Sequence, residues 1–233
     1  MTIFFSLLMT FFLFYSSFFN IVNIETVGNE KTSASLLINT SKIRFGENIL
    51  RADTNLAEEE VLKLPYIKSV NITRQNRNTV RISVEERKEI FSVLSNGLVY
   101  ICDENGRILA KSNISSVYPI VKGVDLKDYE PGQNIFEENE ELNDLKTIID
   151  TAYELQLLDY YLEIRIQDDK EFGLTRVGDI RVDFGTAERA KNKLNFIERT
   201  LESLNAKGKE TSLIKLNTDP PVTFLKDEQN AEE

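Results

Sequence analysis

The sequence predicts an α+β protein with an N-terminal transmembrane helix, a small β-α-α-β-β module and then a mixed-sheet domain with two helices. Three observations support this fold class. No charged side chain occurs between Ile3 and Phe19. Short runs that alternate apolar and polar residues recur between residues 21 and 226, which is typical of strands with one buried face. Two later stretches carry apolar residues at helical spacing.

Residues 1–20 are predicted to anchor the chain in a membrane. Seven of the 14 phenylalanines lie between Ile3 and Phe19. Seventeen helical residues span about 26 Å, and continuing the helix through Val22 would approach the ~30 Å hydrocarbon core. A cleavable signal peptide is the alternative, but no basic residue precedes the apolar run and residues 16–19 make a poor cleavage site. Charge alone does not decide the orientation, because the first basic residue, Lys31, follows the segment.

The composition argues against catalysis and against nucleic-acid binding. The 233-residue chain has a net charge of −10, no histidine and one cysteine. Its acidic surface repels phosphate backbones, and the lack of histidine removes the commonest general base and metal ligand. No phosphate-binding glycine motif or nucleophile elbow is present. We therefore expect no enzymatic activity, no cofactor, no metal and no small-molecule substrate.

The single cysteine is expected to be structural. Cys102 ends the apolar run that starts at Leu98, and the next residues are Asp103 and Glu104. Acidic neighbours oppose formation of a thiolate, so the pattern favours a buried strand residue over a reactive thiol.

Residues 21–87 predict the β-α-α-β-β module. Ser33 is the expected N-cap of the first helix, and Asn55 that of the second, with Glu58 reaching back to it. Pro65 ends the second helix. The strands are predicted at residues 21–27, 70–73 and 80–84, the last two forming a hairpin around residues 75–78.

The pattern of apolar and polar residues between positions 88 and 226 predicts the mixed-sheet domain. Apolar spacing indicates helices over residues 142–155 and 187–204, with Lys191, Lys193 and Arg199 on the outside of the second. The acidic run 137–141 is most simply a solvated helix start; a calcium site is the alternative, but its spacing does not match an EF-hand loop. A polar tail at residues 227–233 is expected to be disordered. Strands are predicted at residues 90–94, 98–102, 107–109, 162–166, 180–184, 212–216 and 222–225, with a loop between 166 and 180.

Several runs of the sequence resemble a known family. Those that resemble a POTRA (polypeptide-transport-associated) domain are Phe19–Asn29, Gly46–Ile49, Leu64–Ile67 and Asn78–Arg87. An anchor followed by one such module is similar to the FtsQ/DivIB cell-division family. The run Val182-Asp183-Phe184-Gly185, the lysine-rich helix after it and the closing strands resemble that family's β domain. Thr26 and Asn78 stand where the family usually has valine and proline, and both fit a strand.

The resemblance implies a single-pass membrane protein at the division septum, with its ectodomain outside the cytoplasm. Such proteins are non-catalytic scaffolds that bind the small membrane proteins FtsB/DivIC and FtsL and help control septal peptidoglycan synthesis. The family's partner strand docks on the last strands of the β domain. The matching positions here are Lys215, Asn217, Val222, Thr223 and Phe224.

Three alternatives remain open at this stage. Phe224 could bind a partner strand, or its side chain could instead pack in the core of the domain. A protein-translocation or outer-membrane assembly component is the alternative function, because POTRA modules also precede β-barrels, although a barrel needs many further alternating strands. An anchored sensor of an extracellular ligand would require a pocket.

Overall fold

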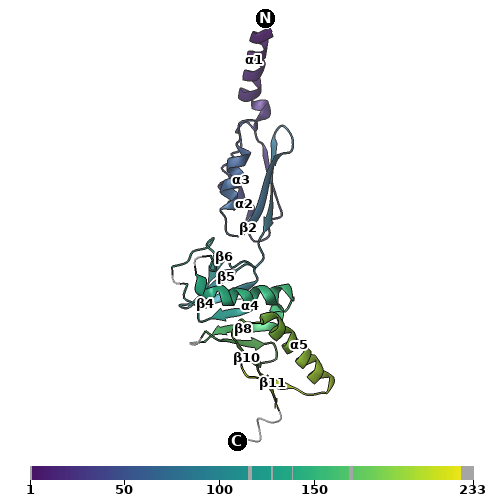
Figure 1. Cartoon of the computed structure of the whole chain (residues 1–233). Helices are drawn as coiled ribbons and strands as arrows, with labels where there is room; N and C mark the ends of the chain where they lie inside the picture. The colour runs from purple at the N-terminus through teal and green to yellow at the C-terminus, as the bar shows by residue number, and fades with distance from the viewer. Residues whose placement is uncertain (1, 115–116, 127, 138, 168–169, 227–233) are drawn as a thin grey trace. The chain divides into compact units, whose positions relative to one another are not determined.

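A computed structural model describes residues 2–114, 117–126, 128–137, 139–167 and 170–226 (Figure 1). The polar tail predicted at residues 227–233 lies outside this described part. The chain divides into two compact units, Met1–Lys88 (unit 1) and Glu89–Glu233 (unit 2). Each unit has its own buried apolar cluster.

Unit 1 begins with helix α1, which runs from Thr2 to Tyr15. Its 14 residues extend about 21 Å at 1.5 Å per residue. Among the described residues, no helix combines the length and the apolar character that crossing a membrane requires. The predicted continuation through Val22 is wrong. Ile21 is 1% exposed in the unit 1 core, and its N–H donates to the Glu47 carbonyl over 2.8 Å, so this segment belongs to the sheet module.

The rest of unit 1 is the predicted β-α-α-β-β module. Its elements are β1 (Asn23–Val27), α2 (Ala34–Ser41), α3 (Thr54–Leu62), β2 (Ile67–Arg74) and β3 (Thr79–Glu86). The sheet order is β1-β3-β2, with β1 parallel to β3 and β2 antiparallel to it. Leu37 of α2 and Val61 of α3 are buried with Val80 and Ile82 of β3, so both helices contribute to a single core with the sheet.

The helix starts of unit 1 confirm one predicted cap and correct the other. Ser33 Oγ accepts from the Leu36 N–H over 3.2 Å, as expected of an N-cap. The second helix is capped by Asp53 and not by Asn55, because the Asp53 carboxylate accepts from the Leu56 N–H over 3.1 Å. Glu58 does not reach back to the cap. Its carboxylate accepts from the Ile72 N–H over 2.7 Å and ties α3 to β2.

Glu86 fixes the loop between β1 and α2. Its carboxylate accepts from the backbone N–H groups of Glu30, Lys31 and Thr32 over 2.9, 2.8 and 2.7 Å. Partial burial by itself raises the pKa of this carboxyl, but hydrogen bonds from Lys31, Thr32 and Glu30 outweigh it and hold the pKa below its ordinary value. Gly28, just after β1, lets the backbone at this point approach β3 closely. A Cβ at position 28 would lie 2.0 Å from the Val84 carbonyl oxygen.

Unit 2 contains a nine-stranded mixed sheet in the order β12-β11-β10-β9-β8-β7-β4-β5-β6. Its strands are β4 (Phe91–Ser95), β5 (Leu98–Cys102), β6 (Ile108–Ser112), β7 (Ile120–Lys122), β8 (Tyr161–Ile166), β9 (Phe172–Arg176), β10 (Ile180–Gly185), β11 (Thr211–Lys215) and β12 (Val222–Leu225). The helices are α4 (Asn143–Glu154) and α5 (Ala190–Ala206). β9 corrects the predicted loop between residues 166 and 180.

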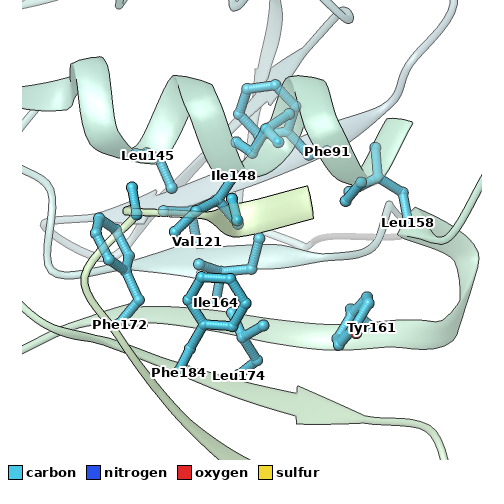
Figure 2. Close-up of a cluster of buried hydrophobic side chains, with 14 of the residues drawn as sticks. Phe91, Val121, Leu145, Ile148, Leu158, Tyr161, Ile164, Phe172, Leu174 and Phe184 are labelled. Carbon is cyan, nitrogen blue, oxygen red and sulfur yellow. The ribbon is translucent and has the colours of Figure 1, made fainter. Parts of the chain in front are cut away.

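One face of this sheet carries the core. A continuous row of paired residues crosses it, and each is buried: Val93, Val121, Ile164, Leu174, Val182 and Ile214. Figure 2 shows Leu145 and Ile148 of α4 over this face, near Val121. Leu194 and Ile197 of α5 belong to the same buried cluster. Side chains alternate along a strand, so the residues directly before and after each member of the row lie on the opposite face of the sheet. We call this the helix-free face, because α4 and α5 both pack on the face that carries the row.

The second helix of unit 2 differs from the prediction in two respects. It begins at Ala190, three residues later than expected, and Lys193 does not lie on its outside. Lys193 Nζ donates to the Phe184 carbonyl over 3.0 Å and to the Thr186 carbonyl over 2.8 Å. Burial lowers the pKa of this amine, against the opposing influence of Glu188 and Glu171. Lys191 is exposed as predicted.

Cys102 is buried within β5, which confirms the structural prediction. Burial, assisted by the charge of Asp103, raises the pKa of the thiol well above its ordinary range. The thiol therefore stays protonated and inaccessible in the folded unit.

The two ends of the nine-stranded sheet differ in what lies beside the outermost strand. At the β6 end, a neighbouring segment runs along the strand: the Ile108 N–H donates to the Gln133 carbonyl over 2.9 Å, and the Gly132 N–H donates to the Ile108 carbonyl over 2.8 Å. At the other end, no further strand among the described residues pairs with the outer side of β12.

Candidate partner-binding edge

The last two strands place most of the predicted site residues in one hairpin-like pair. β12 runs antiparallel to β11, with Lys215 opposite Val222 and Ile214 opposite Thr223. Phe224 lies opposite Leu213. β11 in turn runs parallel to β10, so the pair is an extension of the main sheet.

The register divides these residues between the two faces of the sheet. Ile214 is fully buried on the helix-covered face, so its partner Thr223 lies on that face as well. Val222 and Phe224 lie on the helix-free face, where Val222 is 39% exposed and Phe224 is half-buried. Lys215 Nζ lies 5.6 Å from the centre of the Phe224 ring. Phe224 therefore packs on the outside of β11 and not in the core.

The backbone of β12 offers hydrogen-bonding groups on its outer side. Two contacts show which groups point inward: the Lys226 N–H donates to the Glu210 carbonyl over 3.1 Å, and Thr211 Oγ1 donates to the Phe224 carbonyl over 2.6 Å. Because successive residues of a strand point their backbone groups to alternate sides, those of Thr223 and Leu225 point away from β11. An extended peptide could pair with them.

An ion pair closes the end of this strand pair. Lys226 Nζ donates to the Glu210 carboxylate over 2.8 Å. The hydrogen bond lowers the pKa of Glu210 and raises that of Lys226, so both groups stay charged over a wide pH range. Both are exposed, and the contact therefore orients the strand ends more than it stabilises them.

The structure separates Asn217 from the other predicted residues. It follows Leu216, whose N–H donates to the Asp183 carbonyl over 2.8 Å and so continues the pairing with β10. Asn217 Nδ2 donates to the Glu171 carboxylate over 3.3 Å. This side chain connects the end of β11 to the segment before β9 and does not line the β12 edge.

Leu213 is a residue of the site that the sequence reasoning missed. It is half-buried on the helix-free face opposite Phe224, and it forms an apolar surface there with Val222 and Phe224. The signal was the apolar pair Leu213-Ile214, of which only one member can face the core of a strand. We call the outer face of Leu213, Lys215, Val222 and Phe224, with the outer backbone of β12, the β12 edge.

The β12 edge suits the binding of an extended chain. The sequence contains no histidine. In the part of the chain that the structure describes, no group of three or more Cys, Asp or Glu side chains is placed to hold a metal ion. Among the described residues, the site presents the backbone of a last strand beside apolar side chains and one lysine.

The fold defines the class of protein, and comparison with known sequences agrees. Unit 1 has the β-α-α-β-β order of a POTRA domain. A family model described as "POTRA domain, FtsQ-type" matches residues 19–87.

Two relatives that match most of the chain show its family, and a third matches a shorter part of it. Cell division protein DivIB of Clostridium acetobutylicum is 31% identical over 182 residues, which cover 76% of this chain and 72% of that protein. DivIB of Clostridium tetani is 27% identical over 224 residues, 91% of this chain and 82% of the relative. Cell division protein FtsQ of Corynebacterium glutamicum is 28% identical over 85 residues, 36% and 38% of the two chains. The chain belongs to the FtsQ/DivIB family of cell-division proteins.

Proposed function

We propose that this protein is a non-catalytic scaffold of the division machinery that binds a partner strand at the β12 edge. The observation that supports this most directly is the open side of β12, the terminal strand of a nine-stranded sheet. Strand addition supplies affinity through backbone hydrogen bonds, and side-chain pockets on alternate residues supply selectivity. The FtsB/DivIC-like and FtsL-like membrane proteins of the same cell are the proposed partners, through which the protein helps control septal peptidoglycan synthesis.

The proposed organisation assigns one task to each part of the chain. Residues 1–20 are the single-pass membrane anchor, 21–87 the POTRA domain and 88–226 the partner-binding β domain, outside the cytoplasm at the septum. In support of the anchor, α1 has no charged residue and exposes aromatic side chains such as Phe4, Phe5 and Phe11. A helix with apolar residues on every side requires an apolar environment. Because α1 is short, the bilayer would become thinner around it, or the side chains that flank it would extend to the membrane surface.

The anchor is tested by extraction of membranes. The full chain should remain in the membrane pellet after alkaline carbonate treatment and should enter the soluble fraction only with detergent. A variant that lacks residues 2–15 should be released by carbonate alone. Release of the intact full chain by carbonate would refute the anchor.

The partner edge is tested by charge substitution on its outer face. Val222→Glu and Phe224→Asp each place a carboxylate where a partner strand would bury an apolar side chain, so we expect at least about a tenfold loss of affinity. The measurement is a titration of the detergent-solubilised full chain with the FtsB/DivIC-like protein of the same organism. Circular dichroism establishes that each variant is folded.

A matched control separates the edge from a general effect of charge. Leu98→Glu makes a similar change at a position of similar exposure, 37%, on β5 near the other end of the sheet. It should bind the partner as the unaltered chain does. Undiminished binding by folded Val222→Glu and Phe224→Asp chains would overturn the proposed edge.

A further inference from the structure

The loop of residues 44–51 lies beside the point where the chain passes from α1 into the sheet of unit 1. The Ile49 N–H donates to the Phe19 carbonyl over 2.8 Å, and Asn48 Nδ2 donates to the Leu13 carbonyl, near the end of α1, over 2.9 Å. The turn before β3 reaches the same segment, since Arg77 Nη1 donates to the Phe18 carbonyl over 3.2 Å. Loop and turn therefore lie within one hydrogen bond of the uncharged N-terminal segment.

Apart from the polar Gln75 and Asn76, the exposed side chains of this loop and turn are basic or apolar. Phe45 is 61% exposed and Leu50 is 41% exposed. The Arg51 guanidinium lies 5.7 Å from the centre of the Tyr15 ring, and that of Arg77 lies 4.2 Å from the centre of the Phe18 ring. We call this surface the basic rim, and it consists of Arg44, Phe45, Leu50, Arg51 and Arg77.

The charge of the basic rim is opposite to that of the whole chain. The chain carries a net charge of −10, yet the loop of residues 44–51 and the turn of residues 75–78 contain three arginines and one acidic residue, Glu47. The nearest following acid, Asp53, is already engaged as the N-cap of α3. Arginine remains charged at any physiological pH. A local positive surface therefore lies where the apolar segment meets the folded unit.

We propose that the basic rim binds anionic phospholipid headgroups and thereby holds unit 1 against the membrane surface. The inference rests on the proposed anchor, which would bring the rim within a Debye length (about 8 Å at physiological salt) of the bilayer. Arginines next to a membrane segment bind anionic lipid, and exposed aromatic side chains favour the interface. At the usual strength of such contacts, each arginine should favour the membrane-bound state of unit 1 roughly fivefold.

The test measures how closely the rim approaches the lipid in the complete chain. A bimane fluorophore is attached to Phe45→Cys in the full chain, reconstituted into vesicles that contain brominated lipid as a quencher. The native Cys102 is buried and does not compete for the label. Vesicles of phosphatidylcholine alone are compared with vesicles that also contain phosphatidylglycerol. A second chain carries the label at Lys63→Cys, just after the opposite end of α3.

The expected result is stronger quenching at position 45 in the anionic vesicles, with little change at position 63. Raised ionic strength should weaken the additional quenching at position 45 in the anionic vesicles. Replacing Arg44, Arg51 and Arg77 together by glutamine should remove the difference between the lipids. The charge-matched control, Lys31→Gln with Lys68→Gln and Lys88→Gln, changes unit 1 by the same amount outside the rim and should leave quenching intact.

Two results would overturn the inference, and they are distinguishable. If the chain enters both kinds of vesicle but position 45 is quenched equally in both, the rim does not bind anionic lipid and the anchor stands. If the chain fails to float with either kind of vesicle, the anchor itself is refuted and the rim proposal falls with it.

Discussion

Glu86→Gln should loosen the loop between β1 and α2 without unfolding unit 1. In the unaltered chain, one carboxylate accepts three backbone N–H bonds of 2.7 to 2.9 Å, from Glu30, Lys31 and Thr32. A hydrogen bond to a charged group is worth about 1.5–3 kcal/mol when removed. Glutamine keeps one acceptor oxygen but loses the charge, and the site is only partly buried. We therefore expect a local cost of about 1–2 kcal/mol.

The measurement is amide hydrogen exchange in the full chain, followed by mass spectrometry. A local cost of 1–2 kcal/mol corresponds to roughly 5- to 30-fold faster exchange at Lys31 and Thr32. The matched control is Glu85→Gln, the same change on the adjacent residue. The Glu85 side chain is 62% exposed and forms a 3.6 Å ion pair with Lys68, which is worth little at a surface. Unchanged exchange at residues 30–32 in Glu86→Gln would refute the reasoning.

The same substitution has a defined pH dependence. The pKa of Glu86 in the folded chain lies below the ordinary value of 4.5. A carboxyl group with a lowered folded pKa contributes stability above its unfolded pKa, and that contribution is lost as the pH falls through the folded value. The difference in exchange between Glu86→Gln and the unaltered chain, compared at each pH, should therefore be full at neutral pH and shrink below about pH 4.5. A difference that grows on acidification would contradict the proposed sign.

Two further predictions concern the core of unit 2. Cys102 should not react with a maleimide in the native chain and should react once urea unfolds unit 2, because its thiol is buried and its pKa is raised; rapid stoichiometric labelling without urea would contradict this. Ile164→Ala should move the onset of Cys102 labelling to lower urea, with a loss of about 2–5 kcal/mol against about 0.5–1.5 kcal/mol for Ile164→Val, because Ile164 is 2% exposed at the middle of the core row. Equal onsets for the two variants would show that this side chain does not pack as described.

The features that were predictable from sequence are those set by neighbours along the chain. The β2–β3 hairpin follows from strict alternation on both sides of one turn, and the β4–β5 hairpin from Asn96-Gly97, both of which have the positive φ that such a turn requires. β9 escaped prediction because only Phe172 and Leu174 mark its buried face, and two apolar residues are too few to give a period. The choice of Asp53 over Asn55 as the cap is equally invisible, since both residues are good N-caps.

The candidate site depended on contacts that are distant in the sequence. The apolar pair Leu213-Ile214 does not reveal which residue faces the core; the parallel pairing of Ile214 with Val182 decides it. Lys193 fits the outer face of a helix by spacing, but its amine turns inward because it donates to the carbonyl groups of Phe184 in β10 and of Thr186 just after the strand. Asn217 is near Val222 in sequence, yet its hydrogen bond to Glu171 places it with another part of the sheet.

The segment that runs along β6 affects how copies of this protein can meet. A sheet with two exposed ends could join end to end with further copies, and because such a contact does not close on itself, it would grow into a fibre. Here Gly132 and Gln133 occupy the backbone groups of Ile108 at the start of β6, so a β12 strand from another molecule would have to displace this segment to pair along the whole strand. The segment beside β6 therefore opposes the head-to-tail growth of a line of copies through that end of the sheet.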